Sequence, residues 1–170
     1  MGDNPVDIAY IWSGLIRREF LYKFGCLFDN DYFFYVEDVD LGLRIWLSGC
    51  KVCYIPDSIV YHIGSVSRII HKPHYLTFLM ERNLLTTFFK ILQIKNIFLL
   101  LPYVLIMRFT AIIKDIISLD FKNAIARMSA IFWVVLNIKK IIKKRGLIQK
   151  NRIVNDKRLF SLFTERYFFK

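Results

Sequence analysis

The first 62 residues alternate short apolar segments with polar turns, and this pattern predicts strands and helices in turn. Residues 6–12 alternate loosely between apolar and polar positions, and residues 51–55 do the same before Pro56, so both segments predict strands. Between the two strands, the apolar spacing predicts helices over about 17–24 and 37–48. Alternating strands and helices predict an α/β fold for this part of the chain.

Small residues mark the ends of these elements. Ser13-Gly14 ends the first strand at a point where the backbone can turn or approach a ligand. Gly49 is a natural stop for the second helix, because glycine readily adopts the left-handed conformation that follows many helices. Residues 59–62 predict one more short strand.

From Pro73 onward the apolar positions recur with helical spacing, and Pro73 itself suits the first turn of a helix. Two uncharged segments follow, 12 residues at 96–107 and 10 residues at 129–138. Both are shorter than the roughly 20 residues that span a bilayer. Pro102 lies inside the first segment and Arg108 follows it, which argues against one spanning helix. The pattern favours helices that lie in a membrane interface.

Composition and charge divide the chain at about residue 72. Of the 170 residues, 55% are hydrophobic, which exceeds the usual content of a soluble domain of this length. Residues 1–62 carry 5 basic and 9 acidic side chains, whereas residues 63–170 carry 20 and 5. We therefore expect a domain that performs chemistry over 1–72 and a basic helical region over 73–170 that contacts an anionic surface.

Lipid fits this anionic surface better than nucleic acid does. The basic region has no helix-turn-helix or finger pattern, so we expect no nucleic acid partner. Residues 139–145 place five positive charges beside an apolar run with Trp133, which is typical of a helix on anionic headgroups. Met1 is not followed by a basic and then apolar stretch, so we expect the cytoplasmic face of the cell membrane.

An acidic cluster opens the helix predicted at 37–48. Asp40 and Arg44 stand four residues apart and can pair, which leaves Glu37 and Asp38 at the mouth of the helix. A carboxylate there can accept a proton from a hydroxyl, as an inverting sugar transfer requires. The alternative is a solvated helix start, whose carboxylates only complement the helix dipole.

A longer series of motifs closely resembles family 2 glycosyltransferases, and most of all their rhamnosyltransferase-like branch. The resemblance extends over about residues 12–90. Its motifs, in order, are Ser13-Gly14-Leu15-Ile16-Arg17-Arg18-Glu19, Gly25, Phe28-Asp29, Tyr32-Phe33-Phe34-Tyr35-Val36-Glu37-Asp38-Val39-Asp40-Leu41-Gly42-Leu43-Arg44, Gly49-Cys50-Lys51-Val52, Tyr54-Ile55-Pro56-Asp57, Val60-Tyr61-His62 and Arg82-Asn83.

The resemblance implies a GT-A fold, a Rossmann-like α/β domain that uses a nucleotide-sugar donor and usually Mn²⁺ or Mg²⁺. Asp38 matches the catalytic base of the family, and Glu37 matches an acidic neighbour that helps to place the acceptor. In this interpretation Asp40 and Arg44 hold the cluster in shape. The expected acceptor is a glycan or a polyprenyl-linked sugar of cell-surface polysaccharide synthesis.

Two more positions take a role only from the resemblance. His62 matches a ligand to the metal on the donor diphosphate, and Ser13-Gly14 matches a turn that lines the sugar and acceptor pocket. Without the family, His62 would be interpreted as a core histidine at a strand end, and Ser13-Gly14 as a strand terminator.

The donor half of such an enzyme does not match any part of the chain. That half ends in an Asp-x-Asp metal motif, and no Asp-x-Asp precedes Trp12. Asp29-Asn30-Asp31 and Asp38-Val39-Asp40 have this spacing but lie on the acceptor side. The sequence therefore indicates a partial GT-A domain: an acceptor-side, C-terminal fragment of a glycosyltransferase, followed by an all-helical region.

Two rival interpretations remain open. Cys50, Cys53, His71 and His74 have the order of a Cys₂His₂ zinc site, with 17 residues between the pairs. The spacing of the second pair is short, and strand alternation would point the two sulfurs to opposite faces. The other rival is an inert, membrane-associated remnant or adaptor.

Overall fold

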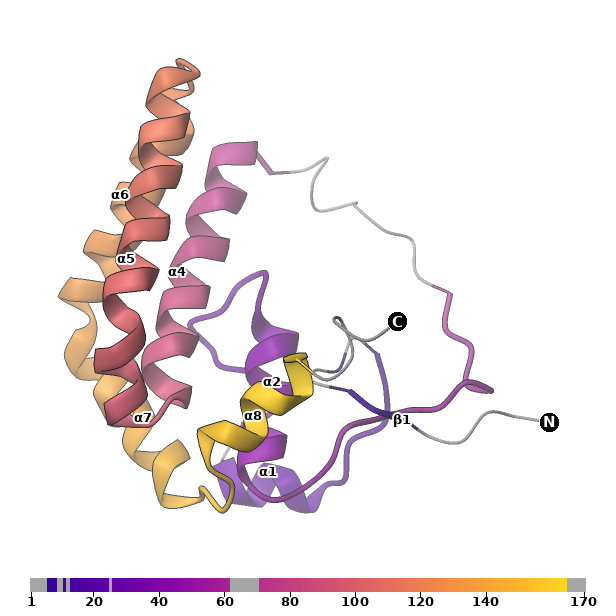
Figure 1. Ribbon diagram of the computed structural model, residues 1–170. Coiled ribbons are helices and arrows are strands. Elements are labelled where there is room, and N and C mark those ends of the chain that lie inside the picture. The colour runs from indigo at the N-terminus through magenta and orange to yellow at the C-terminus, as the bar shows by residue number, and fades with distance from the viewer. Residues whose placement is uncertain (1–5, 9–10, 12, 25, 62–70, 165–170) are drawn as a thin grey trace.

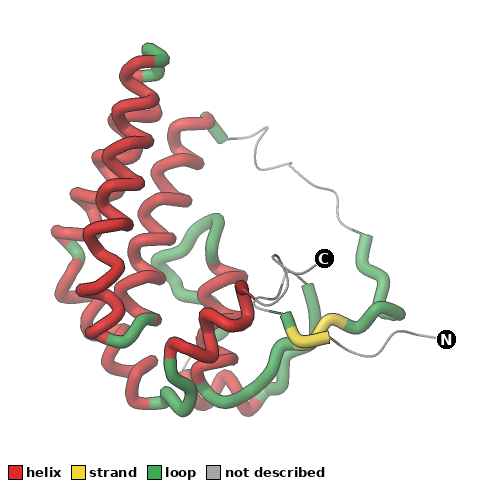
Figure 2. Tube along the Cα trace, in the orientation of Figure 1, coloured by secondary structure: helices red, strands yellow, loops and turns green. Residues whose placement is uncertain are grey.

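The computed structural model describes residues 6–8, 11, 13–24, 26–61 and 71–164, and it is mostly helical. Two short strands pair with each other, and Figure 2 shows them as one small yellow segment among red helices. The elements in chain order are β1 (Val6–Asp7), α1 (Glu19–Phe24), α2 (Glu37–Leu47), β2 (Cys53–Tyr54), α4 (Pro73–Ile91), α5 (Ile94–Ile117), α6 (Phe121–Leu136), α7 (Ile138–Lys150) and α8 (Asp156–Thr164).

The expected Rossmann-like α/β fold is wrong. Strands β1 and β2 have two residues each and pair antiparallel, with Val6 opposite Tyr54 and Asp7 opposite Cys53. A Rossmann-like domain needs several parallel strands joined by crossover helices, and such a sheet is absent from the described residues. The alternation at 6–12 is loose, and the described residues 59–61 have no regular structure, so little of the pattern forms strands.

Several helices match the sequence pattern. Helix α1 lies within the predicted 17–24, α2 lies within 37–48, and α4 begins at Pro73. Gly49 has a φ of 77°, the left-handed conformation expected just after α2. These signals are local, because each depends on residues within one or two turns of the chain.

Helices α4 to α7 form a bundle, and α1, α2 and α8 lie beside it with the two strands (Figure 1). Helix α4 lies between the two parts, because it packs on α6 and α7 and also on α2. One apolar core joins residues of the N-terminal part, such as Phe24, Leu41 and Trp46, to Ile91 and Ile148 of the bundle. The division at residue 72 stays a prediction.

Helix α5 runs without interruption through Pro102. Pro102 therefore does not break the helix, and the expectation that the helices lie in a membrane interface stays a prediction. Within the described ranges, α5 is the one helix that is long and apolar enough to cross a membrane. Leu119 follows it with a φ of 58°, and Asp120 then caps α6 by accepting a hydrogen bond from the Asn123 amide at 3.2 Å.

Candidate functional site

The turn before α2 has an unusual backbone. Tyr35 and Val36 have φ values of 66° and 69°, in the left-handed region that residues with a side chain rarely adopt. This conformation is least favourable for a β-branched residue such as valine. Val36 is the residue that precedes Glu37, and no side chain caps the helix there. The acidic cluster therefore follows directly on two strained residues.

Asn83 of α4 holds this turn in place. Its side-chain amide donates hydrogen bonds to the carbonyl oxygens of Phe34 and Tyr35, both at 2.8 Å. The Asn83 side chain is completely buried, and its own oxygen accepts from Nε of Arg82 at 2.9 Å. Arg82 also donates to the carbonyl of Asp31 at 2.7 Å. Arg82-Asn83 thus fixes the chain on the N-terminal side of the acidic cluster.

Glu37 and Asp38 are the half-buried carboxylates of the cluster. Oδ1 of Asp38 accepts from the Val39 amide at 2.8 Å, so it satisfies a free N–H of the first helical turn. Oε2 of Glu37 is buried and has no hydrogen-bond partner among the described residues. Burial raises the pKa of Glu37, and the negative charge of Asp38 raises it further.

Asp40 lies beneath these two residues and is completely buried. Its Oδ2 accepts from Nε of Arg44 at 2.8 Å, so the predicted pair between the two residues is confirmed. Nζ of Lys90, from α4, lies 2.8 Å from the other oxygen of Asp40. Arg44 also donates to the carbonyls of Cys26 and Leu27, at 3.3 and 2.6 Å. Asp40 and Arg44 are therefore held by partners inside the protein, and their role in shaping the cluster stays a prediction.

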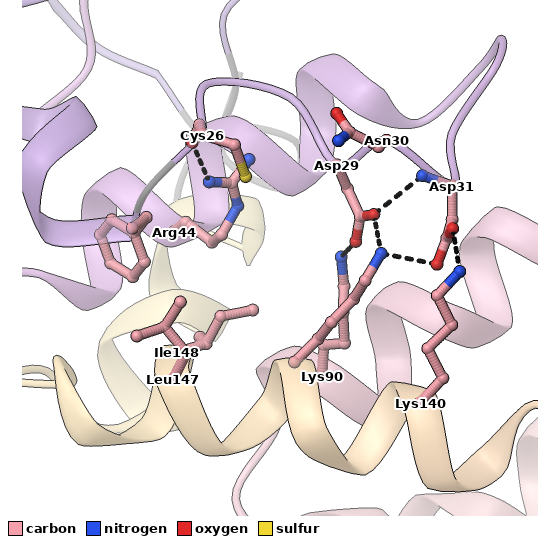
Figure 3. Close-up of a pocket in the computed structure, with 11 residues that line it drawn as sticks. Cys26, Asp29, Asn30, Asp31, Arg44, Lys90, Lys140, Leu147 and Ile148 are labelled. Atoms are coloured by element: carbon pink, nitrogen blue, oxygen red, sulfur yellow. Dashed lines mark hydrogen bonds and ion pairs between the residues drawn. The ribbon is translucent and has the colours of Figure 1, made fainter.

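A pocket of about 300 Å³ lies on the other side of Lys90, between the turn at 29–31 and α7. Figure 3 shows lysines meeting Asp29 and Asp31 at its wall. Lys90 donates to Asp29 at 2.5 Å, and Lys140 donates to Asp31 at 2.5 Å. Lys144 contacts both aspartates, with its Nζ 2.6 Å from Oδ2 of Asp31. These charges neutralise one another, so the pocket wall acts as a structural ion network.

The network shifts the titration of its members. Burial alone would raise the pKa of Asp29, but the charge of Lys90 and hydrogen bonds from Lys144 and Lys90 outweigh it and hold the pKa well below its usual value. The pKa of Asp31 is also lowered, because its hydrogen bonds to Lys140 and Lys144 outweigh its burial. Burial alone would lower the pKa of Lys144, but the hydrogen bonds and charges of the two aspartates outweigh it, so the pKa is raised. All three ions are therefore favoured in the folded state.

Glu37 and Asp38 differ from the neighbouring aspartates because they have no ion pair within the described part of the chain. The aspartates at 29, 31 and 40 form ion pairs with basic side chains. Glu37, in contrast, has a carboxylate oxygen without a hydrogen-bond donor in the described part of the chain. A carboxylate held at a helix start can accept a hydrogen bond or a proton from a hydroxyl group. The strained turn fixes the position from which it would do so.

The remaining predicted site residues are only partly described. Ser13 and Gly14 are exposed in the segment between β1 and α1, and Gly14 lies against Ile11 of the same segment. Their role in an acceptor pocket stays a prediction. His62, predicted as a metal ligand, lies outside the described residues.

Among the described residues, three or more His, Cys, Asp or Glu side chains do not gather in a group suited to a metal ion. This includes the four residues of the rival zinc site, whose cysteines are exposed. The ring of His71 instead contacts Phe33 and Tyr75. The four residues of the rival zinc site are therefore not gathered in the described structure, and the expected Mn²⁺ or Mg²⁺ stays a prediction.

Three residues of the site were not singled out from the sequence. The sequence motifs include Asn83 and Asp29 but give neither a role, and Lys90 does not belong to them. Lys90 could have been found from the sequence, because it is the one charged residue in the otherwise uncharged stretch 83–94. A lysine that is buried in such a stretch needs a partner of opposite charge. The identity of that partner depends on the fold, since Asp29 is 61 residues away.

Comparison with protein-family models, with curated proteins and with solved structures found no match for this chain.

Proposed function

We propose that this chain supplies the acceptor-side catalytic segment of an inverting glycosyltransferase, in which Asp38 is the general base. The acceptor hydroxyl would attack the anomeric carbon of a nucleotide sugar, and the bond from that carbon to the diphosphate would break. The hydroxyl proton passes to Asp38, and the nucleoside diphosphate leaves with the bonding electrons. A base in this role typically contributes about 10²- to 10⁴-fold to the rate.

The observation that carries the proposal is the braced, left-handed turn at Tyr35 and Val36. Residues in such conformations cost about 1–3 kcal/mol each and cluster at functional sites. If the carboxylates only complemented the helix dipole, they would need to lie near the first turn of α2. They would not need a strained backbone before them or a buried side-chain amide that binds this backbone. Asn83 provides that amide, and its motif belongs to the same resemblance as the acidic cluster.

Glu37 would bind the acceptor next to the base. Burial raises its pKa, and its buried oxygen lacks a donor among the described residues. An acceptor hydroxyl could therefore donate to Glu37 while a neighbouring hydroxyl of the same sugar faces Asp38. The negative charge of Glu37 also disfavours a second anion in the site, which suits a neutral sugar acceptor.

The donor nucleotide belongs to another segment in this proposal, joined to this chain or associated with it. The Mn²⁺ or Mg²⁺ that the resemblance implies would be held mainly by that other segment and by the donor diphosphate, because the described residues do not gather three or more His, Cys, Asp or Glu side chains. We place the reaction at the cytoplasmic face of the membrane, because the basic helices from Pro73 onward favour contact with its anionic leaflet. The acceptor would be a glycan or a polyprenyl-linked sugar.

The test is sugar transfer by membranes from cells that express the gene with its flanking coding sequence. Labelled nucleotide sugars are supplied, and wild type is compared with Asp38→Asn. Loss of the base should lower transfer by at least about 100-fold while donor binding is retained. Asp57→Asn is the matched control, because Asp57 is an exposed aspartate in a turn.

Near-normal transfer by Asp38→Asn would show that the base assignment is wrong. If wild type transfers no sugar from any nucleotide donor while the chain still binds membranes, the inert-remnant interpretation is favoured instead. Donor binding measured by calorimetry on the same preparations separates a lost base from a lost site.

A further inference from the structure

Helices α5 and α6 expose a broad apolar surface. We call it the outer face, and its centre comprises Phe98, Ile106, Phe109 and Ile113 of α5 with Ile125 and Phe132 of α6. Each of these side chains is more than half exposed, and Phe98 is 72% exposed. On α5, the described burial is confined to Ile112. Soluble monomers rarely expose so large an apolar surface unless it binds something.

Three of the charged side chains of α5 and α6 are paired inside the bundle. Arg108 of α5 lies 3.5 Å from Glu81 of α4, and Arg127 of α6 also pairs with Glu81. Nε of Arg127 donates to Asp115 of α5 at 2.8 Å. The four charges cancel in the space between the three helices. Pairing ionisable groups inside a bundle is how proteins keep a lipid-facing surface apolar.

The exposed charges that remain on these helices are mainly lysines, and Asp120 in the turn between α5 and α6 is the exposed carboxylate among them. Lys95 and Lys114 of α5, Lys122 of α6, and Lys139 and Lys143 of α7 are exposed and have no ion pair within the described part of the chain. The other basic residues of the segment 139–145 are committed to the fold. Lys140 and Lys144 bind the aspartates of the pocket, and Arg145 donates to the carbonyls of Phe89 and Leu92 at 2.6 Å.

An apolar face with unpaired lysines is complementary to an anionic lipid bilayer. The apolar side chains can be buried among the lipid acyl chains, and each lysine near the membrane surface adds attraction to anionic headgroups. A second copy of the chain would be a poorer partner, because its own lysines would meet these lysines. The charge pattern thus selects lipid as the occupant of the outer face.

The packing also indicates how the hairpin of α5 and α6 lies. Helix α6 packs along α4, and α4 packs on its other side against α2. The hairpin therefore forms one side of the bundle, and its turn reaches beyond the start of α4 in Figure 1. Insertion across a bilayer would carry α4 with Glu81 and Arg82 into lipid, whereas lateral contact leaves α4 in water.

We propose that the outer face of α5 and α6 docks flat on an anionic bilayer, with Lys139 and Lys143 of α7 at the headgroups. This arrangement is independent of sugar transfer. It holds the turn at Tyr35 and Val36 on the water side of α4, since α4 separates α2 from the hairpin. It also revises the expectation that all five basic residues of 139–145 contact lipid, because three of them bind within the chain.

Vesicle flotation of the purified chain tests the apolar part. The variant Phe98→Gln with Ile106→Gln and Ile113→Gln keeps helix propensity and net charge, and it should lower binding by more than about 100-fold. The matched control changes Leu15, Tyr22 and Ile59 to Gln. These three apolar residues are at least as exposed but lie outside the bundle, so binding should be unchanged.

The charge part is tested on vesicles of phosphatidylcholine with and without phosphatidylglycerol. Lys139→Gln with Lys143→Gln should lower binding to the anionic vesicles by roughly 30-fold, and salt should weaken binding by wild type. Lys23→Gln with Lys157→Gln is the control, because both lysines are exposed on helices outside the bundle.

The flat arrangement is tested by labelling at the hairpin turn. Ser118→Cys, in a chain with Cys26, Cys50 and Cys53 changed to Ser, should react with an impermeant maleimide added outside vesicles that already carry the protein. Protection that detergent removes would overturn flat docking. Failure of wild type to float, together with a dimer that the triple Gln variant dissociates, would overturn lipid as the partner. Both results leave the transferase proposal to its own assay.

Discussion

The buried side-chain amide of Asn83 donates a hydrogen bond to the carbonyl oxygen of Tyr35 at 2.8 Å, across 48 residues of sequence. Tyr35 needs this partner because its φ of 66° turns the chain into a conformation that local interactions do not favour. The same amide binds Phe34 as well. Asn83 thus connects α4 to the backbone that presents Glu37 and Asp38.

Loss of the Asn83 amide should release this turn. Asn83→Asp keeps the oxygen that accepts from Arg82 and removes both donors, so we expect unfolding in urea to require about 2 kcal/mol less free energy. Asn155→Asp, at an exposed position whose side-chain oxygen accepts from the Arg158 amide, is the control and should be near neutral. A wild-type stability for Asn83→Asp would show that the turn does not depend on the amide.

Lys90 should be essential for stability, because it is 1% exposed and compensates two buried carboxylates, Asp29 and Asp40. Lys90→Met leaves both without that cation and should cost about 3–5 kcal/mol in urea unfolding. Lys139→Met, on the surface of α7, should change stability by less than about 0.5 kcal/mol. A double variant with Asp40→Asn should lose less than the sum of the single variants, since it removes one of the unpaired charges.

Stability should fall in acid. The pKa values of Asp29 and Asp31 are lowered in the folded state, so their contribution is complete above about pH 4, the pKa of an unfolded aspartate, and is lost as the pH falls through the folded values. Asp31→Asn should flatten the acid limb of a plot of urea midpoint against pH. An equally steep limb in that variant would assign the acid sensitivity to other groups.

The same network predicts a loss of stability at alkaline pH. The pKa of Lys144 is raised above its ordinary 10.5, so its contribution is present below that value and is lost as the pH rises through the folded value. Lys144→Met should lack this step. Unfolding in urea at a series of alkaline pH values would measure it, and the same step in Lys144→Met would contradict the assignment.

Glu37 should titrate above the usual range for glutamate, mainly because it is half buried. The charge of Asp38 is the smaller cause, so Asp38→Asn should lower the Glu37 midpoint without returning it to the ordinary value. Carboxyl chemical shifts followed by NMR would measure both effects. Asp57→Asn should leave the midpoint unchanged, and an equal shift in both variants would show that Asp38 has no specific effect.

Two glycines should respond in opposite directions to alanine. Gly49 has a φ of 77°, and an added Cβ would lie 3.4 Å from Cδ1 of Ile153, so Gly49→Ala should cost about 1 kcal/mol. Gly146 lies inside α7 with no atom within 4 Å of an added Cβ, so Gly146→Ala should gain about 0.5–1 kcal/mol. Thermal unfolding of both variants would show the difference, and a loss in Gly146→Ala would contradict the packing of α7.

The sequence determined the features that depend on near neighbours. Helices α1 and α2, the start of α4 at Pro73, the stop at Gly49 and the pair of Asp40 with Arg44 were all predicted, because each arises within about one helical turn. The predicted sheet failed for a related reason. A strand is stable only through partners elsewhere in the chain, and the alternation at 6–12 does not reveal whether they exist.

Only the tertiary structure decided which residues support the acidic cluster and which face water. Asn83 and Lys90 reach Tyr35 and Asp29 across 48 and 61 residues, and Lys144 reaches Asp29 across 115. The basic segment 139–145 has the composition of a lipid contact along its whole length. Three of its five basic residues nevertheless bind carboxylates and carbonyls inside the protein, because the packing of the helices brings these partners together. Spacing along a chain specifies local geometry, whereas the partner of a buried charge is set by which helices pack together.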